Sequence, residues 1–496
     1  MFHSNVRSLI YSYHGPEERE TIVIERAPTG IDGLDPLIGG GFPRRSLILL
    51  TGEPGTGKTI FGSTFLCRGA TQYGENGIYV SFLEGKETLI ANLSAFCDQD
   101  HVKLDKEGKF RILDLVTAKE SGITANLEMI LDEIYKLNAK RLVIDSFSSI
   151  AQALNEPIEA RMILHTILSN MVRQMGCTTL LIVETPTGTK GLGLGMEEFV
   201  ADGVIILKRG TLDGRLSREL EIAKLRGTKI DSPEHPFTLE GGFTVFSQFS
   251  HKSFEHMERL KRIPDSGRYF STGSKSLDKI LEGGFPKGTL VLLEVDKAVP
   301  LTAYGVLSYP IVSNFLNNGS PLVGVQSLGA DPSMTYERWK AFAGKNVAYA
   351  RSIEKLRGGA KEEKPYLVLL KGKTSEEKTA EYLEVGNRLR KKTGKPVVWW
   401  VALDHFVDIF GAEHAEEVLS ELSVNVIRNR ELAVILAKPG LERITASASN
   451  IAAIHLRMFD RYGSVLLYGV KPRTSLCAVT IDVKKGLSSA GFTPIA

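Results

Sequence analysis

Apolar and polar residues alternate along the chain in blocks typical of an α/β protein. Short apolar runs that fit buried parallel strands precede longer segments whose apolar positions recur at helical spacing. In the first half, the expected strands are residues 46–50, 77–83, 110–115, 141–145 and 178–184, and the expected helices are 60–73, 86–97, 125–138 and 157–175. This alternation predicts a doubly wound domain with a mostly parallel sheet and helices on both faces.

The second half repeats the pattern. Sliding the chain by about 243 positions places residues 271–293 on 28–50 without a gap, which indicates an internal duplication. The expected strands are 322–327, 366–371, 397–403 and 432–437, the expected helices are 334–342, 376–392 and 415–428, and a β-rich tail follows. The sequence therefore predicts two tandem α/β domains.

A chain of 496 residues is too long for one ordinary hydrophobic core. The expected divisions are an N-terminal arm at 1–26, a first domain at 27–246, a polar linker at 247–266 and a second domain at 267–496.

The segment Gly52–Thr59 reads Gly-Glu-Pro-Gly-Thr-Gly-Lys-Thr and lies between the first expected strand and helix. Glycines allow backbone N–H groups to surround a phosphate chain, the lysine supplies a cation, and the last threonine can ligate Mg²⁺. The motif predicts a P-loop for ATP and Mg²⁺. The expected nucleotide-binding residues are Gly52, Glu53, Pro54, Gly55, Thr56, Gly57, Lys58, Thr59 and Ile60.

Two carboxylates follow expected strands beside this loop. Asp145 ends a buried strand, so we expect it near the Mg²⁺ that Thr59 would ligate; an aspartate that caps the next helix is the alternative. Glu84 ends the strand 77–83 and could orient or deprotonate the attacking water. A solvated loop glutamate is the alternative there.

Two further features of the first half bear on the site. Lys224 and Arg226 are two positions apart on an expected strand and project to one face, a geometry that suits phosphate binding. The glycine-rich stretch 185–196 is expected to be a mobile loop at the carboxyl edge, either lining a channel or serving as a connector.

The second copy does not preserve the P-loop. Opposite Gly55, Gly57 and Lys58 stand Ala298, Pro300 and Leu301. A loop without the lysine, and with a proline in place of an inward N–H, is not expected to bind ATP. Asp404 ends a strand where the first copy has Asp145, and helix capping is its favoured role.

The order of motifs resembles a known family. Thr-Gly-x-x-x-Leu-Asp with Gly-Gly-Phe-Pro, the P-loop, Glu84, Asp145-Ser146, the acidic run 197–202 and Lys-Leu-Arg-Gly-Thr are similar, over residues 27–246, to the RecA-fold ATPases of the KaiC type, relatives of RadA. The resemblance implies two RecA-like domains, the second degenerate, and ATP between neighbouring protomers of a ring, commonly a hexamer. It also implies that Lys224 and Arg226 act in trans.

One departure concerns catalysis. KaiC-type sequences usually carry paired glutamates where this chain has Leu83-Glu84. Only one carboxylate remains, which predicts slow or altered ATP turnover. The expected catalytic set is Lys58, Glu84, Lys224 and Arg226.

The overall composition adds few constraints. A formal charge of +3 points to neither nucleic acid nor an anionic membrane, and the basic segments 355–364 and 388–395 fit a solvated loop and a helix end. The four cysteines are widely separated, which fits a reducing cytoplasm and argues against a zinc site. The apolar runs are too short to span a bilayer.

These features predict an ATP-hydrolysing protein in regulation or signalling. The first alternative is an ATP-gated regulatory binding module, resembling archaeal regulators of gas-vesicle expression, that docks an unidentified protein. A RadA-like recombination factor is the second, and it is disfavoured because neither a helix-hairpin-helix module nor a concentrated basic face is apparent. Phosphorylation of the second copy is not expected.

Overall fold

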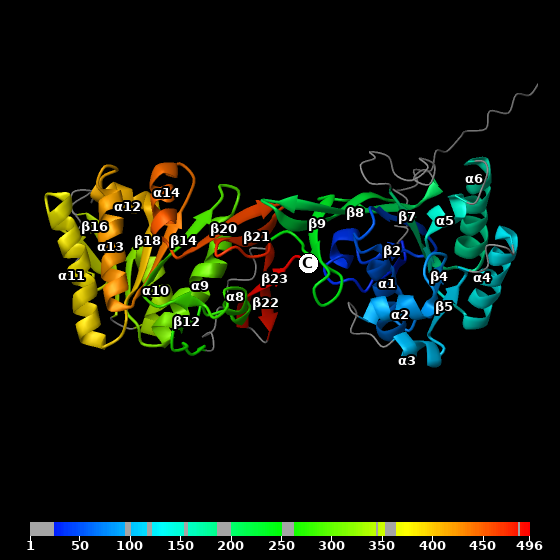
Figure 1. Ribbon diagram of the computed structural model, residues 1–496, viewed down its shortest axis with the longest axis horizontal. Coiled ribbons are helices and arrows are strands. Elements are labelled where there is room, and N and C mark those ends of the chain that lie inside the picture. The colour runs from blue at the N-terminus through cyan, green and yellow to red at the C-terminus, as the bar shows by residue number, and fades with distance from the viewer. Residues whose placement is uncertain are drawn as a thin grey trace, which may run out of the picture.

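Two lobes lie end to end along an elongated molecule (Figure 1). The computed structural model describes residues 24–94, 101–116, 122–152, 157–185, 200–249, 262–343, 346–352, 364–484 and 487–496. We call the part before residue 250 the first lobe and the part after residue 261 the second lobe. Most of the expected N-terminal arm and most of the expected linker lie outside the described residues.

The first lobe is built on a nine-stranded sheet of order β11-β10-β9-β8-β3-β7-β6-β4-β5. Strands β8 to β5 in this order are parallel, and β9, β10 and β11 continue the sheet antiparallel. The strands are β3 (Leu47–Gly52), β4 (Gly77–Ser81), β5 (Phe110–Asp114), β6 (Arg141–Asp145), β7 (Thr178–Glu184), β8 (Gly203–Leu212), β9 (Arg215–Leu225), β10 (Glu234–Thr238) and β11 (Thr244–Val245), beside the small pair β1 (Arg26–Ala27) and β2 (Phe42–Pro43).

Helices cover both faces of this sheet. Ile48 and Leu50 of β3 pack with one cluster that includes α1, and Leu47 and Leu49 pack with the cluster on the opposite face that includes α4. The helical elements are η1 (Asp35–Ile38), α1 (Lys58–Gln72), α2 (Lys86–Ser94), α3 (His101–Lys106), α4 (Ile123–Leu137), α5 (Phe147–Gln152), α6 (Pro157–Thr166) and the π-helix η3 (Ile167–Gln174).

The second lobe repeats this plan with a ten-stranded sheet of order β17-β16-β15-β18-β19-β14-β20-β21-β22-β23. Its strands are β14 (Thr289–Val295), β15 (Leu322–Val325), β16 (Val347–Ser352), β17 (Leu367–Leu370), β18 (Val398–Ala402), β19 (Leu432–Ala437), β20 (Ile454–Arg461), β21 (Ser464–Lys471), β22 (Cys477–Lys484) and β23 (Leu487–Pro494), beside β12 (Tyr269–Phe270) and β13 (Phe285–Pro286). The helices are α8 (Lys275–Ile280), α9 (Leu301–Asn317), α10 (Pro332–Ala343), α11 (Ser375–Thr393), α12 (Leu403–Phe410), α13 (Ala415–Asn429) and α14 (Glu442–Ile451).

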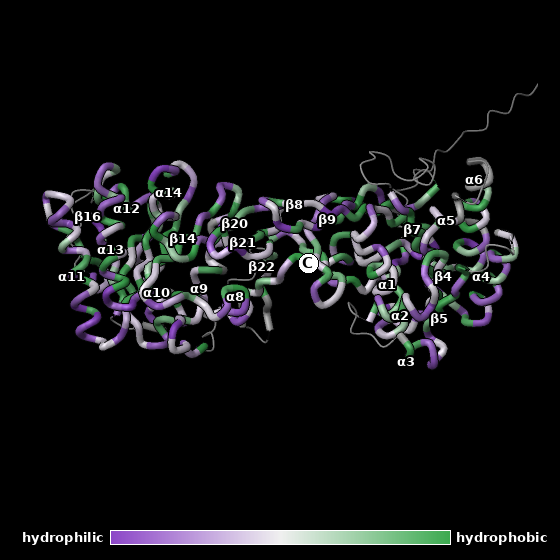
Figure 2. Tube along the Cα trace, viewed as in Figure 1, coloured by the Kyte–Doolittle hydropathy of each residue, from purple (hydrophilic) through white to green (hydrophobic). Residues whose placement is uncertain are grey.

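The predicted fold class is confirmed: two tandem RecA-like α/β domains with mostly parallel sheets and helices on both faces. Among the elements that the sequence pattern missed are the long helix α9, the strand β16 and the helices α12 and α14. In Figure 2 the apolar residues concentrate along the central strands and the inward sides of the helices. That distribution is the source of the periodicity from which most elements were predicted.

The duplication extends to individual hydrogen bonds. In the first lobe, the amide and hydroxyl of Thr29 donate to Asp35 Oδ1 at 2.8 and 2.7 Å. In the second lobe, the amide and hydroxyl of Thr272 both donate to Asp278 Oδ1 at 2.7 Å. The shared Thr-Gly-x-x-x-Leu-Asp motif therefore shapes the turn before each sheet, and it remains where the P-loop does not.

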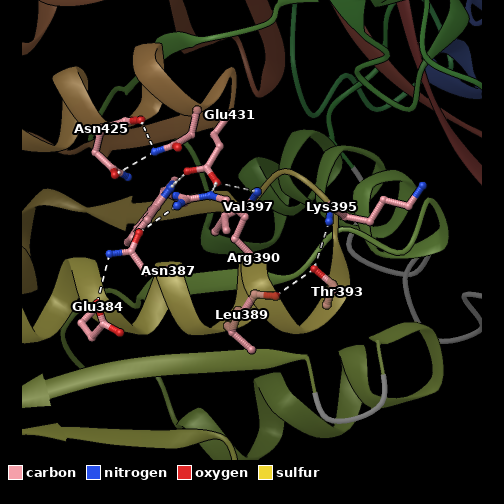
Figure 3. Close-up of polar contacts among 11 residues, drawn as sticks. Glu384, Asn387, Leu389, Arg390, Thr393, Lys395, Val397, Asn425 and Glu431 are labelled. Atoms are coloured by element: carbon pink, nitrogen blue, oxygen red, sulfur yellow. Dashed lines mark hydrogen bonds and ion pairs between the residues drawn. The ribbon is translucent and has the colours of Figure 1, made fainter.

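A buried carboxylate organises the amino edge of the second sheet (Figure 3). Glu431 is fully buried and accepts from Arg390 Nε at 2.7 Å, Trp399 Nε1 at 2.9 Å and the Val397 amide at 3.1 Å. These donors come from α11, β18 and the residue before β18. A buried charge is tolerated when paired and hydrogen-bonded in this way.

The lobes meet through the long hairpin of β8 and β9 and the outer strands of the second sheet (Figure 1). Phe246 packs with Phe459, Leu466 and Ile495 in an apolar cluster. Around it, Arg461 Nη2 pairs with Glu219 at 2.6 Å. The contact thus combines an apolar centre with charged groups, like a protein–protein interface.

Candidate functional site

The P-loop forms where β3 passes into α1. A Cβ at Gly52 would lie 2.3 Å from the carbonyl oxygen of Leu207, so only glycine fits beside β8. Gly57 has a φ of +102°, a conformation that side chains disfavour. These two positions explain why the loop needs glycine where the strand ends and where the helix begins.

Lys58 lies inside the loop and is only 7% exposed. Its Nζ donates to the carbonyl oxygens of Gly52 at 2.8 Å and Glu53 at 3.0 Å. Burial lowers the pKa of Lys58, while the carboxylates of Glu184 and Asp145 oppose this shift. The loop therefore already holds the ammonium group that a phosphate chain would contact.

A cavity of about 700 Å³ opens in front of the loop. Of the predicted residues, Pro54, Gly55, Gly57, Lys58, Thr59, Ile60, Glu84 and Asp145 line it. Gly52, Glu53 and Thr56 are not among the lining residues. Thr56 is buried, and its hydroxyl donates to the Glu53 carbonyl at 2.8 Å. This bond stabilises the shape of the loop without contributing to the cavity surface.

Asp145 ends β6, as predicted, and faces the start of α1. Its Oδ2 accepts from the Thr59 hydroxyl at 3.1 Å and from the Tyr79 hydroxyl. Burial raises the pKa of this carboxyl, and the hydrogen bonds from Tyr79 and Thr59 with the charge of Lys58 act against that. The donors to Oδ2 are on α1 and β4, which favours a position beside the loop over a capping role at the helix that follows.

The donor set fits Mg²⁺. A hydroxyl and a carboxylate oxygen close together are the ligands this ion takes beside phosphate oxygens and water. Within the described ranges, no group of three or more His, Cys, Asp or Glu side chains could hold a metal by itself. The chain would therefore supply Thr59 and Asp145, with phosphate and water completing the coordination.

Glu84 lines the cavity, but the prediction that it ends a strand was wrong. Strand β4 ends at Ser81, whose hydroxyl donates to the Glu84 carbonyl at 2.6 Å and accepts from the Glu84 amide at 3.2 Å. These bonds fold residues 81–84 into a turn. The Glu84 carboxylate there accepts from Asn92 Nδ2 at 3.0 Å.

The sequence interpretation missed Glu184 and Arg218 as cavity residues. Glu184 ends β7, the neighbour of the P-loop strand, so the strand-end rule that selected Asp145 could have selected it as well. Arg218 comes from the antiparallel strand β9. No local pattern marks such a residue, because the pairing of β8 and β9 decides its position.

Lys224 and Arg226 lie away from the cavity in their own chain. Lys224 Nζ donates to the Ala201 carbonyl at 2.8 Å, and Arg226 pairs with Asp202 at 3.0 Å. Asp202 bonds the amide of Leu47, where β3 begins, whereas the P-loop follows where β3 ends. The two cations are thus at the amino edge, about 17 Å along the strand from the loop.

The acidic run begins at 197, and residues 197–199 lie outside the described part, as does 186–196 of the glycine-rich stretch. Ala201 and Asp202, the last two residues of that run, are described and hold Lys224 and Arg226.

The second lobe lacks the charges of this site. Strand register places Ala402 at the position of Asp145, since Val401 pairs with Ile435 as Ile144 pairs with Leu181. Lys438 then stands where the first lobe has Glu184. Leu301 at the position of Lys58 removes the cation of the loop, and Lys438 at the position of Glu184 replaces a carboxylate with a cation.

Asp404 was placed wrongly by the sequence. It lies two residues beyond the equivalent of Asp145, in the first turn of α12, whose N-cap is Ala402. Its carboxylate accepts from the amides of Leu328 at 3.2 Å and His405 at 2.9 Å and lies 3.6 Å from Lys438 Nζ. It therefore links α12 to the segment after β15 and to the end of β19.

Comparison with known proteins identifies the family. The family model described as "ATPase: KaiC" matches residues 27–248. A UPF0273 protein of Pyrococcus furiosus is 36% identical over 239 residues, which cover 45% of this chain and 95% of that protein. This chain belongs to the KaiC ATPase family. Its membership supports an ATP-binding P-loop function for the first lobe.

Other KaiC-family relatives show how far the likeness extends. The circadian clock oscillator protein KaiC of Thermostichus vulcanus is 32% identical over 313 residues, covering 61% of this chain but only 57% of that protein. The chain therefore spans little more than half the length of that relative. A crystal structure of a KaiC-like protein from Pyrococcus horikoshii OT3 has 38% identity and a TM-score of 0.42, covering 45% of this chain and 100% of that chain.

Among the described residues, no helix combines the length and the apolar character needed to cross a membrane.

Proposed function

We propose that this chain is a cytoplasmic Mg²⁺-dependent ATPase that acts in regulation or signalling, with one ATP site per chain, in the first lobe. The observation that carries the proposal is the convergence of Lys58, Thr59, Asp145 and Glu84 on one cavity at the carboxyl edge of the sheet. Ligands of open α/β sheets bind at this edge. The two domains of the proposal correspond to residues 27–246 and 267–496.

Each residue has a role that follows from its position. The N–H groups of the P-loop and the N-terminus of α1 receive the phosphates, and Lys58 exchanges its carbonyl partners for phosphate oxygens. Thr59 and Asp145 would hold Mg²⁺, which would neutralise negative charge on the phosphates. Glu84 orients the water that attacks the γ-phosphate, and it must exchange its contact with Asn92 to do so.

Lys224 and Arg226 complete the site of a neighbouring protomer in a ring, such as a hexamer. Support comes from their place at the amino edge, too far from the cavity of their own chain to touch its nucleotide. Arg226 would exchange Asp202 for phosphate oxygens of the neighbour. Positive charge delivered in this way stabilises the charge that develops on the transferred phosphoryl group.

Two variants test the proposal. Lys58→Ala should abolish ATP binding, measured by equilibrium dialysis with Mg-ATP. Arg226→Ala should preserve binding and slow phosphate release from ATP. Full activity in either variant refutes that residue's assignment. Phosphate release at background level from the unaltered protein, with ATP bound, would instead support the second candidate.

The second candidate is an ATP-gated regulatory module with little turnover, whose second lobe docks a protein partner. Leu83 favours it, because this exposed apolar residue stands beside Glu84 where the family usually has a second carboxylate. ATP occupancy would then set assembly rather than drive repeated hydrolysis. Mass measurement with and without Mg-ATP distinguishes an assembly response from turnover alone.

A further inference from the structure

Arg218 joins the P-loop to the second lobe. Its Nη1 donates to the carbonyl oxygens of Gly55 at 3.2 Å and Thr56 at 3.4 Å, and its Nε donates to the carbonyl oxygen of Ala496 at 2.6 Å. The residue is 8% exposed and lines the nucleotide cavity together with Ala496. One guanidinium group therefore contacts both a loop of the first lobe and a segment that follows the last strand of the second.

The segment 494–496 is anchored on the first lobe. The Thr238 hydroxyl donates to the Pro494 carbonyl at 2.7 Å and accepts from the Ala496 amide at 3.3 Å. The Leu239 amide donates to the Ala496 carbonyl at 3.3 Å. Ile495 is buried in the apolar cluster between the lobes. Pro494 itself ends β23, so the second sheet sets where the segment lies.

The orientation of the two loop carbonyls bears on ATP binding. The carbonyl oxygens of Gly55 and Thr56 accept from Arg218, which belongs to β9 and not to the loop. A phosphate-binding loop needs its backbone N–H groups directed at the phosphates. In a trans peptide group the carbonyl points opposite to the N–H, so carbonyls fixed by Arg218 also fix the directions of the Thr56 and Gly57 N–H groups. Burial lowers the pKa of Arg218, with the nearby Arg209 acting in the same direction, and a buried guanidinium without its carbonyl acceptors would be costly.

We propose that Arg218 is a positioning residue through which docking of the second lobe tightens ATP binding at the P-loop. The segment 494–496 holds the guanidinium by its Nε, so that Nη1 is aimed at the carbonyls of Gly55 and Thr56. By linkage, ATP must then stabilise the docked segment by the same factor. The inference rests on the proposed ATP site in the first lobe and adds a role for the inactive second lobe.

Two variants loosen the segment from opposite sides. Thr238→Val removes both of its hydrogen bonds to 494–496, and Ile495→Ala removes buried packing from the other side. Each should weaken ATP binding about three- to tenfold, because a displaced segment would misalign the hydrogen bonds from the charged Arg218 guanidinium to Gly55 and Thr56. Thr179→Val, a matched change at a buried threonine of β7 outside this contact, should leave the affinity unchanged.

The double-variant test uses Arg218→Ala, which should weaken binding about tenfold or more. Adding Thr238→Val or Ile495→Ala to it should cause no further loss of ATP affinity, because the contact between segment 494–496 and the P-loop through Arg218 is already absent. Circular dichroism and thermal melting establish that each variant is folded. Unchanged affinity in both segment variants, or full additivity with Arg218→Ala, overturns the proposal.

A second measurement does not depend on affinity. Saturating Mg-ATP should slow hydrogen exchange in peptides covering 487–496 in the unaltered protein, and this protection should vanish in Arg218→Ala. If ATP does not change the rate of hydrogen exchange in these peptides of the unaltered protein, the proposed coupling between the P-loop and segment 494–496 is contradicted. If Lys58→Ala binds ATP normally, the ATP site itself is misplaced, and the failure belongs to the proposed function.

Discussion

The Thr59 hydroxyl donates a hydrogen bond of 3.1 Å to Oδ2 of Asp145. This bond joins the first turn of α1 to the end of β6, two elements separated by 86 positions in the chain. The Tyr79 hydroxyl donates to the same oxygen from β4. These bonds hold together the two groups that we propose as Mg²⁺ ligands, which would reduce the reorganisation that binding requires.

Asp145→Asn should remove the metal-dependent part of ATP affinity. The amide oxygen can still accept from Thr59 and Tyr79, so the change removes mainly the negative charge. We expect about a tenfold or greater loss of affinity with Mg²⁺ and little change in EDTA, measured by equilibrium dialysis. Tyr79→Phe is the control, because it keeps the carboxylate. Equal losses with and without the metal would contradict the assignment.

Mixing the Arg226→Ala and Lys58→Ala variants should raise hydrolysis above that of either variant alone if Lys224 and Arg226 act in trans. An Arg226→Ala protomer has an intact P-loop, and a Lys58→Ala neighbour can supply its arginine. Random assortment of equal amounts would make about a quarter of the interfaces complete. The control mixture pairs Arg226→Ala with the double variant Lys58→Ala/Arg226→Ala. If subunits exchange but hydrolysis in the first mixture does not rise, Arg226 acts in its own chain.

Titration with Mg-ATP should give one bound nucleotide per chain. The second lobe has Leu301, Ala402 and Lys438 where the first has Lys58, Asp145 and Glu184, so its site offers neither the cation at the loop nor the metal ligand. Isothermal titration calorimetry measures the stoichiometry directly. Two sites per chain, or one that survives Lys58→Ala, would locate nucleotide in the second lobe.

Glu431→Ala should destabilise the second lobe by about 3–5 kcal/mol, because it removes a fully buried carboxylate and leaves the Arg390 guanidinium, whose side chain is 25% exposed, without its charge partner. The donors of Trp399 and Val397 lose their acceptor as well. Urea unfolding measures the change. Glu416→Ala, which breaks a pair with the exposed Arg443, is the control and should have little effect. Similar losses in both variants would refute the role of Glu431.

The buried His405 should make stability fall in mild acid. Burial lowers its pKa from the ordinary 6.5, with Arg351 acting in the same direction and Asp408 and Asp404 opposing. Below pH 6.5 the imidazole of His405 binds a proton in the unfolded protein more readily than in the folded protein, where its pKa is lower. The free energy of unfolding therefore decreases as pH falls through this range, by no more than about 1.4 kcal/mol per pH unit for one group.

His405→Asn tests this. An asparagine amide can replace Nδ1 as the donor to the Gln326 carbonyl, which lies 2.9 Å away, but it does not titrate. The difference in urea midpoint between pH 7.5 and pH 5.5 should be smaller in the variant than in the unaltered protein. An identical difference would assign the pH dependence to other groups.

Local pattern was enough for most of the framework. Strands such as 432–437 were predicted because parallel strands buried on both faces are continuous apolar runs. The pattern failed where structure is set by contacts from elsewhere, as at Glu84, where the Ser81 hydroxyl folds the chain into a turn. It also failed at Asp404, because only the strand register shows that α12 begins earlier.

By itself, the sequence determined the duplicated fold, the P-loop and the loss of that loop in the second copy, because these depend on residue type and spacing along the chain. The tertiary structure alone decided that Arg218 reaches the cavity and that Lys224 and Arg226 do not. It also brought 494–496 against the first lobe. The physical reason is that strand order and the packing of the two lobes bring together residues that no short-range periodicity relates.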